Sequence, residues 1–255
     1  IAAFLGVVYS GNFYVPFDAS MPSARATAMR RTMPPVAEIA PDDLDPLCGM
    51  PVDQSLLDRI RTSTIDSDPL YGMFTSGSTG VPKGIVVSHR SVINMAERFT
   101  ETFEIDEGTV FGNQAPFDFD VSVKDIYLTL KNGATTHILP QDSFTFTQRL
   151  METINARRIN TLVWSVSAMK IVSSLGTFPD YRPEHVRLVM FSGEVLPVKV
   201  LNEWRENLPG AEFVNLYGPT EITCNCAYYK IDRDFAIDER IPVGRAFRNT
   251  EILLL

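Results

Sequence analysis

The sequence predicts an α/β protein in which a largely parallel sheet is sandwiched by helices. Apolar runs of strand length recur from residue 85 onward and alternate with helical stretches, as they do in βα units. These runs centre on Val110, His137, Val163, Leu188 and Phe213. The 255 residues are 45% hydrophobic, which is enough to bury one large core. The runs are spaced too irregularly for a repeat array, so they indicate the alternation of a fold.

The N-terminal part carries weaker signals. Residues 1–11 have the pattern of a helix that ends at a glycine, and a short extended piece is expected at 13–17. Proline near the start of a helix predicts a second helix over residues 22–31, with Ser20 as its cap.

The next segment, residues 33–65, is rich in proline and aspartate and is expected to lie on the surface, with a weak helical patch at 56–60. Strands are then expected at 70–74 and 85–87. Further helices are expected over 89–103 (capped by Ser88 or His89), 121–131 (ending at Asn132-Gly133), 147–158, 166–175 and 198–207 (opened by Pro197).

Between the first two strands lies a loop of hydroxyls and glycines, Thr75-Ser76-Gly77-Ser78-Thr79-Gly80-Val81-Pro82-Lys83-Gly84. Glycine permits backbone conformations in which successive N–H groups converge on an anion, and a lysine adds a positive charge, so the loop is suited to phosphate. It is not a Walker A loop, because Lys83 stands between Pro82 and Gly84. The dinucleotide fingerprint also fails, because Gly77 and Gly80 are three apart. The alternative is an ordinary polar hairpin turn.

Polar motifs follow three of the predicted strands. These motifs are Asp118-Phe119-Asp120, Ser192-Gly193-Glu194 and Tyr217-Gly218-Pro219-Thr220-Glu221. In open α/β sheets, ligands bind beyond the carboxyl ends of the strands. A single pocket at one edge of the sheet is therefore expected.

Bulk properties exclude several classes of function. The net charge of -8 argues against nucleic acid as a partner. Three cysteines favour a reducing compartment, and neither a signal peptide nor a run of membrane-spanning length is present, so we expect a cytoplasmic protein without a membrane partner. Cys224 and Cys226 are expected on one face of a strand. Both ends look cut, with residues 252–255 inside a strand. The histidines are too scattered for zinc, and no Gly-x-Ser-x-Gly supports a hydrolase.

The loop at residues 75–84 resembles the phosphate loop of adenylate-forming enzymes, which include acyl-CoA synthetases, luciferases and the adenylation domains of nonribosomal peptide synthetases. Further stretches in the same order make the resemblance specific to amino-acid adenylation: Tyr14-Val15-Pro16-Phe17-Asp18, Phe119-Asp120-Val121-Ser122-Val123 and Asn215-Leu216-Tyr217-Gly218-Pro219-Thr220-Glu221. Two more are similar to D-alanine-activating ligases: Asn113-Gln114-Ala115-Pro116-Phe117 and Phe191-Ser192-Gly193-Glu194-Val195-Leu196-Pro197. The resemblance runs from about Gly6 to Leu255.

The resemblance implies ATP and Mg²⁺ as cofactors. It places the β- and γ-phosphates on Thr75, Ser76, Gly77, Ser78, Thr79, Gly80 and Lys83, and the adenosine beside Gly193, Glu194, Asn215 and Tyr217. Thr220 would donate to the α-phosphate, and Glu221 would bind Mg²⁺, which takes one or two carboxylates plus phosphate oxygens. Thr220, Glu221 and Lys83 are the expected catalytic residues. Each role has an alternative. Tyr217 could be a core aromatic, and Glu221 could be a solvent-facing or helix-start carboxylate. His89 could border the entry of the acid, with a structural cap as the alternative to a catalytic role.

The resemblance also implies an amino-acid substrate held by Asp120. A carboxylate at a strand end among Phe117, Phe119 and Val121 is costly unless it is paired, and a substrate ammonium would pair it. Asp118 is a rival for this role. The side-chain pocket would be lined by Val121, Lys124, Trp164, Ser192, Leu216, Cys224 and Asn225.

Two of the expected pocket residues bear on the identity of the amino acid. Trp164 would favour a small side chain. Lys124 would meet an acidic one or would point to water. Ser192 stands where D-alanine ligases carry cysteine, so the substrate is left open.

The expected function is activation of an amino acid to aminoacyl-AMP and pyrophosphate, followed by transfer to a phosphopantetheinyl carrier protein. Residues 1–255 would form the large N-terminal portion of an adenylation domain, with an ATP- and amino-acid-binding core at 66–255 and without the C-terminal lid. The chain alone is then expected to bind its ligands and to catalyse poorly. The family also predicts a strand just after Arg31, for which 36–39 is a poor candidate. The alternatives are an acyl- or aryl-CoA ligase, which would not need an acid at position 120, and a non-catalytic nucleotide-binding module.

Overall fold

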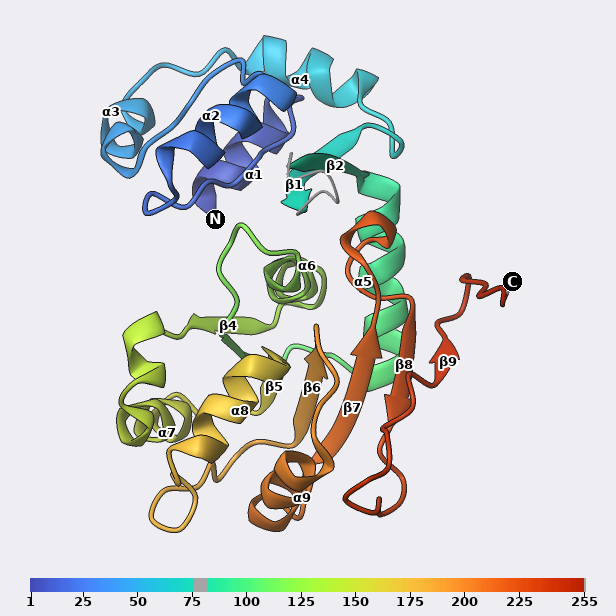
Figure 1. Ribbon diagram of the computed structural model, residues 1–255. Coiled ribbons are helices and arrows are strands. Elements are labelled where there is room, and N and C mark those ends of the chain that lie inside the picture. The colour runs from blue at the N-terminus through green and yellow to red at the C-terminus, as the bar shows by residue number, and fades with distance from the viewer. Residues whose placement is uncertain (76–81, 255) are drawn as a thin grey trace. The chain divides into compact units, whose positions relative to one another are not determined.

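The computed structural model describes residues 1–75 and 82–254, and the chain divides into two compact units, residues 1–93 and 94–255. Among its described residues, the first unit contains helices and one pair of strands (Figure 1). Its elements are α1 (Ala2–Tyr9), α2 (Ser23–Thr32), the short 3₁₀ helix η1 (Pro41–Asp43), α3 (Leu44–Cys48), α4 (Gln54–Ser63), β1 (Pro69–Thr75), β2 (Lys83–Ser88) and the start of α5 (His89–Phe103).

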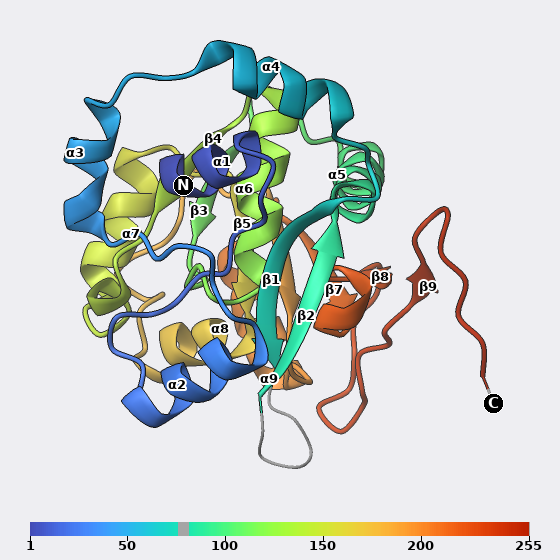
Figure 2. The same cartoon turned by 90° about the horizontal axis from the view of Figure 1, so that it is seen from above.

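Strands β1 and β2 pair antiparallel and form a two-stranded ribbon (Figure 2). In the middle of β1, the Gly72 N–H donates to the Tyr14 carbonyl at 2.8 Å, and the Phe4 ring stacks on the Tyr14 ring at 4.4 Å. A Cβ at Gly84 would lie 2.8 Å from Met33 Cε, so the glycine allows the chain after α2 to pack on the ribbon. The strand–loop–strand prediction is confirmed for its strands, and residues 76–81 of the loop lie outside the described residues.

Two predictions for the first unit were wrong. Ser20 does not cap α2, because its N–H and hydroxyl both donate to Asp18 Oδ1 at 2.7 Å, and Pro22 occupies the N-cap position. Residues 33–65 are mostly exposed, as expected, but they contain η1, α3 and the full helix α4 rather than a weak patch. Asp53 begins α4 by accepting from Leu56 N at 3.0 Å. Residues 36–39, the poor candidate for the strand that the family predicts after α2, form no strand.

The second unit is built on one sheet with the strand order β4-β3-β5-β6-β7-β8-β9. The first five strands in this order run parallel, which confirms the predicted fold class, and β8 and β9 add to the edge antiparallel. Its elements after α5 are β3 (Val110–Asn113), α6 (Val121–Asn132), β4 (Thr135–Ile138), η2 (Gln141–Phe144), α7 (Thr147–Ala156), β5 (Thr161–Ser165), α8 (Val166–Ser174), β6 (Leu188–Ser192), α9 (Val198–Asn207), β7 (Glu212–Tyr217), η3 (Thr220–Ile222), β8 (Ala227–Lys230) and β9 (Arg245–Ala246).

The main apolar cluster joins one face of this sheet to helices α7, α8 and α9 (Figure 1). Trp164 from β5 and Trp204 from α9 lie at its centre, with ring centroids 5.9 Å apart. Helix α6 packs against β3, β4 and β5 on the opposite face, where Asn113 of β3 bonds Asp125 of α6. The sheet is therefore covered on both faces, as a parallel sheet requires.

The helix ends in the second unit follow the local signals. Gly133 ends α6 in the left-handed conformation, and α9 begins directly after Pro197. Helix α5 begins at His89, and Ser88 is its cap, since Ser88 Oγ accepts from Ser91 N at 3.3 Å.

Two predictions for the C-terminal part were wrong. Cys224 and Cys226 precede β8 rather than lie in a strand, and Thr223 and Cys224 are left-handed, with φ of 66° and 69°. Residues 252–254 have no regular secondary structure.

Candidate functional site

The polar motifs of the second unit lie at one edge of its sheet. Strands β3, β6 and β7 run parallel within the same sheet, so their carboxyl ends share an edge. The residues that follow these strands therefore emerge on the same side, as the sequence predicted.

Asp120 is the N-cap residue of α6, but its carboxylate does not cap the helix. A capping aspartate would accept from the second or third N–H of the helix. The half-buried side chain of Asp120 makes no such bond, and no hydrogen bond or ion pair joins it to the described part of the chain. Phe119 beside it is 60% exposed. Asp120 is therefore an anion at the sheet edge that is left available for a ligand.

Lys124 lies one helical turn after Asp120 and is fully buried, so the alternative in which it points to water is wrong. Its Nζ donates to Oδ1 of Asn225 at 2.7 Å, a contact between buried side chains that are 101 residues apart. Cys224 Sγ donates to the Asp120 carbonyl at 3.1 Å. The structure thus brings Asp120, Lys124, Cys224 and Asn225 together, four residues that sequence reasoning assigned to one pocket.

The close packing of this segment depends on Gly218. A Cβ at Gly218 would lie 2.5 Å from Asn225 Cα and 2.8 Å from both Cys224 O and Cys226 N. No side chain fits in that space. Gly218, directly after β7, therefore allows residues 223–226 to pack against the end of β7. Sequence reasoning did not assign a role to this residue.

Asp125 is a second buried ionisable group that sequence reasoning missed. Its Oδ2 accepts from Asn113 Nδ2 at 2.7 Å, and its Oδ1 has no hydrogen-bond partner among the residues described. Burial raises the pKa of Asp125 to about 7, although the Asn113 hydrogen bond and the charge of Lys124 both lower it. The sequence signal for such a group is the pair of amides at the end of a predicted strand, Asn113 and Gln114, because amides that end a buried strand need polar partners.

Ser192 and Trp164 lie on opposite faces of the sheet. Residues in direct register point to the same side. Ser165 pairs with Ser192 and Trp164 with Phe191, so the two serines share the α6 face and the two aromatics share the α7–α9 face. Trp164 is fully buried there, and its Nε1 donates to the Gly112 carbonyl at 2.8 Å. Trp164 is therefore not brought together with Ser192, whereas Ser165 is.

The remaining expected pocket residues lie near the same edge. Leu216 precedes the end of β7 and is buried, and its neighbour Asn215 pairs with Phe191. Leu216 therefore faces the α6 side with Ser192. Val121 begins α6 and is half-buried.

The end of β7 presents an exposed aromatic ring and an exposed carboxylate. Tyr217 is 52% exposed, so the alternative of a core aromatic is wrong. The half-buried Thr220 and the exposed Glu221 open the 3₁₀ turn η3, and neither side chain makes a hydrogen bond with the residues described. Asn215 Nδ2 donates to the Pro242 carbonyl at 2.8 Å.

After β6, Gly193 has a positive φ of 98° and turns the chain toward Glu194. The Glu194 carboxylate accepts from Ser167 Oγ at 2.8 Å and pairs with Lys170 Nζ at 3.2 Å, both on α8. These contacts, the Ser167 hydrogen bond first, lower the pKa of Glu194. The Glu194 side chain is thus engaged within the protein, and its backbone is the part that remains for a ligand.

In the first unit, the ends of the predicted phosphate loop are described. Thr75 at the end of β1 pairs with Lys83 at the start of β2, and Lys83 is exposed. Ser76, Gly77, Ser78, Thr79 and Gly80 lie outside the described residues, so their predicted contacts stay predictions.

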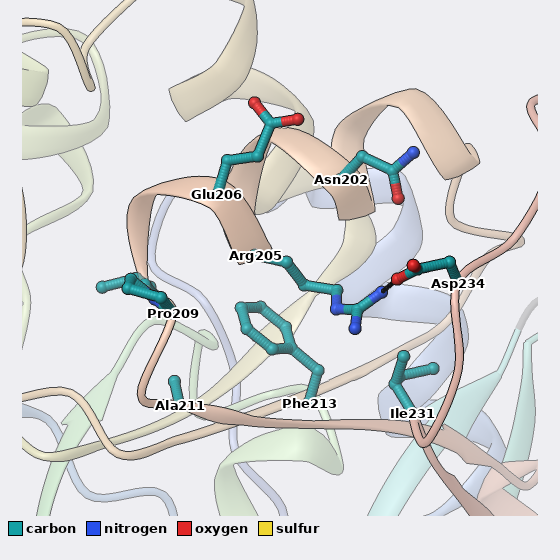
Figure 3. Close-up of a pocket in the computed structure, with 9 residues that line it drawn as sticks. Asn202, Arg205, Glu206, Pro209, Ala211, Phe213, Ile231 and Asp234 are labelled. Carbon is teal, nitrogen blue, oxygen red and sulfur yellow. Dashed lines mark hydrogen bonds and ion pairs between the residues drawn. The ribbon is translucent and has the colours of Figure 1, made fainter.

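A groove at the opposite edge of the second unit contains none of these residues. It lies where α9 ends and β7 begins, and Arg205 Nη1 crosses it to pair with Asp234 Oδ1 at 2.9 Å (Figure 3). Within the described ranges, no three His, Cys, Asp or Glu side chains gather into a metal-binding group, and no helix is long and apolar enough to cross a membrane. Cys48, Cys224 and Cys226 form no disulfide bond in the described part of the chain.

Comparison with known proteins identifies relatives over the full chain. Residues 1–255 match the family of AMP-binding enzymes. The chain is 31% identical over 272 residues to the D-alanine--D-alanyl carrier protein ligase of Lactiplantibacillus plantarum and 32% identical over 271 residues to that of Bacillus velezensis. Each alignment covers 100% of this chain and 53% of the relative, so the chain spans about half the length of these relatives.

Solved structures show the same fold. The crystal structure of IdnL7 is 25% identical with a TM-score of 0.80, and the match covers 97% of this chain and 55% of that one. The Vibrio cholerae adenylation domain AlmE, in complex with glycyl-adenosine-5'-phosphate, is 22% identical with a TM-score of 0.77, covering 97% and 53%. The predicted fold and the predicted resemblance are confirmed.

Proposed function

This chain belongs to the family of AMP-binding enzymes, and on that premise we propose that it activates an amino acid with ATP for transfer to a carrier protein. The products of the first step are an aminoacyl adenylate and pyrophosphate. In the second step the aminoacyl group passes to the phosphopantetheine thiol of the carrier. The printed names of the D-alanyl carrier protein ligases support both the amino-acid substrate and the carrier partner.

The observation that carries this proposal is the carboxylate of Asp120. It stands at the start of α6, half-buried, and no group in the described ranges satisfies it. A carboxylate in that position gains most from an ammonium, which supplies both charge and hydrogen-bond donors. An acyl- or aryl-acid substrate would offer neither, so an amino acid fits better than an acid without an amino group.

The nucleotide would be held by the residues that the resemblance to adenylate-forming enzymes assigns to it. The exposed Tyr217 ring offers a face for adenine, and the Thr220 hydroxyl a donor for the α-phosphate. Lys83 and the loop it ends would bind the β- and γ-phosphates. The exposed carboxylate of Glu221 fits Mg²⁺, which takes its other ligands from phosphate and water and would neutralise charge on the polyphosphate.

The chemistry requires little more than orientation and charge. The substrate carboxylate attacks the α-phosphorus in line with the leaving pyrophosphate, and Asp120 fixes the ammonium end of the same molecule. Thr220 and Lys83 stabilise negative charge on the phosphate oxygens as it redistributes. Because every residue in this proposal lies within 66–255, we also propose that range as the ATP- and amino-acid-binding core.

Calorimetric titration of the chain with individual amino acids and with adenosine tests the proposal. Asp120→Ala is expected to abolish amino-acid binding and to leave adenosine binding unchanged, and the exposed Asp238→Ala is the matched control. Amino-acid binding that survives in Asp120→Ala but is lost in Asp118→Ala would transfer the role to Asp118. Binding that survives both changes would contradict the proposed function.

A further inference from the structure

Asp120 and Lys124 carry opposite charges one turn apart on α6 but do not form a salt bridge. Side chains four residues apart lie on the same helix face, with about 5–6 Å between their Cβ atoms, and would normally pair. Asp120 occupies the N-cap in a helical conformation, so this spacing holds. Lys124 Nζ instead donates to Asn225 Oδ1 at 2.7 Å. One helix face therefore presents an anion and a cation that do not neutralise each other.

Lys124 and Asn225 both keep hydrogen-bond donors after they bond each other. An ammonium has three N–H groups, so two remain after the bond to Asn225. Because Lys124 occupies Asn225 Oδ1, the Asn225 amide nitrogen is left to donate, and it makes no bond within the described part of the chain. Lys124 is 0% exposed, so water does not surround its ammonium as it would on a surface, and Asn225 is 8% exposed. The atom they suit is an acceptor, and a charged ammonium favours an anionic one.

The nearest carboxyl does not fill this role. Asp125 follows Lys124 in α6, but its carboxyl is directed to Asn113, and no ion pair joins it to Lys124. Burial also raises the pKa of Asp125 to about 7, so only part of it is charged at neutral pH. The charge of Lys124 is left without a full counter-ion in the second unit.

We propose that the amino acid activated by this protein has an acidic side chain, whose carboxylate binds Lys124 Nζ and Asn225 Nδ2 while its ammonium binds Asp120. This inference rests on the proposed function and names its substrate class. Aspartate and glutamate carry an ammonium and a side-chain carboxylate a few bonds apart, which matches an acid and a base one helical turn apart. Alanine of either hand would leave the buried ammonium without an anion.

Calorimetric titration with aspartate and glutamate, each in both enantiomers, tests the inference against asparagine, glutamine and D-alanine. At least one acid is expected to bind about 10- to 100-fold more tightly than its amide, which is the effect of a hydrogen-bonded charge. Lys124→Met is expected to remove this preference. Lys131→Met, an exposed lysine at the end of the same helix, is the matched control and is expected to keep it. Far-UV circular dichroism checks that Lys124→Met keeps the fold.

The outcomes separate the two proposals. If an acid and its amide bind equally, or if D-alanine binds more tightly than both acids, the inference of an acidic substrate is wrong. The proposed function is still supported in that case if amino-acid binding requires Asp120. If no amino acid binds in an Asp120-dependent manner, the proposed function itself is wrong. If Lys124→Met does not fold, the ligand series on the unmodified chain decides the question alone.

Discussion

Replacing Asp125 by asparagine tests whether the buried carboxyl under the sheet edge titrates near neutrality. Burial raises the pKa of Asp125 from 3.8 to about 7 in the folded chain. Asparagine has the same shape, keeps an acceptor for Asn113 Nδ2, and cannot ionise. Asp125→Asn therefore removes the titratable carboxyl group and changes little else in the structure.

The sign and size of the effect follow from proton linkage. The folded chain holds the Asp125 proton more tightly than the unfolded chain, so folding takes up a proton between pH 3.8 and about 7. The stabilising contribution is fully present below pH 3.8 and is lost as the pH rises to about 7. Over about three pH units, at about 1.4 kcal/mol each, the free energy of unfolding falls by about 4 kcal/mol. This is a large part of the stability of a typical domain.

Urea unfolding followed by tryptophan fluorescence measures this change. Trp164 and Trp204, the two tryptophans of the chain, both lie in the second unit with Asp125. The free energy of unfolding of Asp125→Asn relative to the unmodified chain is expected to rise by about 4 kcal/mol from pH 4 to pH 8. Asp142→Asn, an exposed control, is expected to show no such trend. A difference between Asp125→Asn and the unmodified chain that is the same at pH 5 and pH 8 would refute the reasoning.

Two further changes test other parts of the structure. Gly218→Ala places a methyl group 2.5 Å from Asn225 Cα, so it is expected to destabilise the chain by about 1–3 kcal/mol in urea and to weaken amino-acid binding. Gly210→Ala, where a Cβ meets nothing within 4 Å, is the control, and equal losses in both variants would contradict the close approach. Lys83→Met is expected to weaken ATP binding about 10-fold in calorimetry, with its effect falling as salt rises, whereas an unchanged affinity would remove this lysine from the phosphate site.

The fold was predictable where residues act locally. Pro197 and Gly133 mark the start of α9 and the end of α6, and both ends were predicted within a residue or two. The alternation of apolar runs with helical stretches predicted the parallel strands, because that pattern also depends on the local sequence. The strand predicted at Cys224 and Cys226 was wrong because Thr223 and Cys224 adopt left-handed conformations that neither residue type favours. This segment lies against Gly218, a close approach that the local sequence does not indicate.

The candidate site was predictable as a set of residues but not as a set of contacts. The motif positions identified Asp120 and Lys124, whereas the partner of Lys124 lies 101 residues away and no local pattern indicates it. Lysine is rarely buried, so solvent was a reasonable alternative for its side chain. The face of Trp164 depends on strand register, in which a shift of one residue reverses the direction of every side chain.

Strands β7 and β8 form a hairpin that carries residues proposed for both substrates. Tyr217 pairs with Ala227, and its carbonyl accepts from the N–H of Cys226 at 2.8 Å, the residue directly after Asn225, whose side-chain amide is proposed to bind the amino acid. A nucleotide that orders Tyr217 would therefore also order the 223–226 segment, and the two ligands should bind cooperatively. We expect AMP to tighten amino-acid binding by the same factor by which the amino acid tightens AMP, as linkage requires. Titrations of each ligand with the other absent or saturating measure that factor. A value of one would show that the β7–β8 hairpin does not couple the two binding sites.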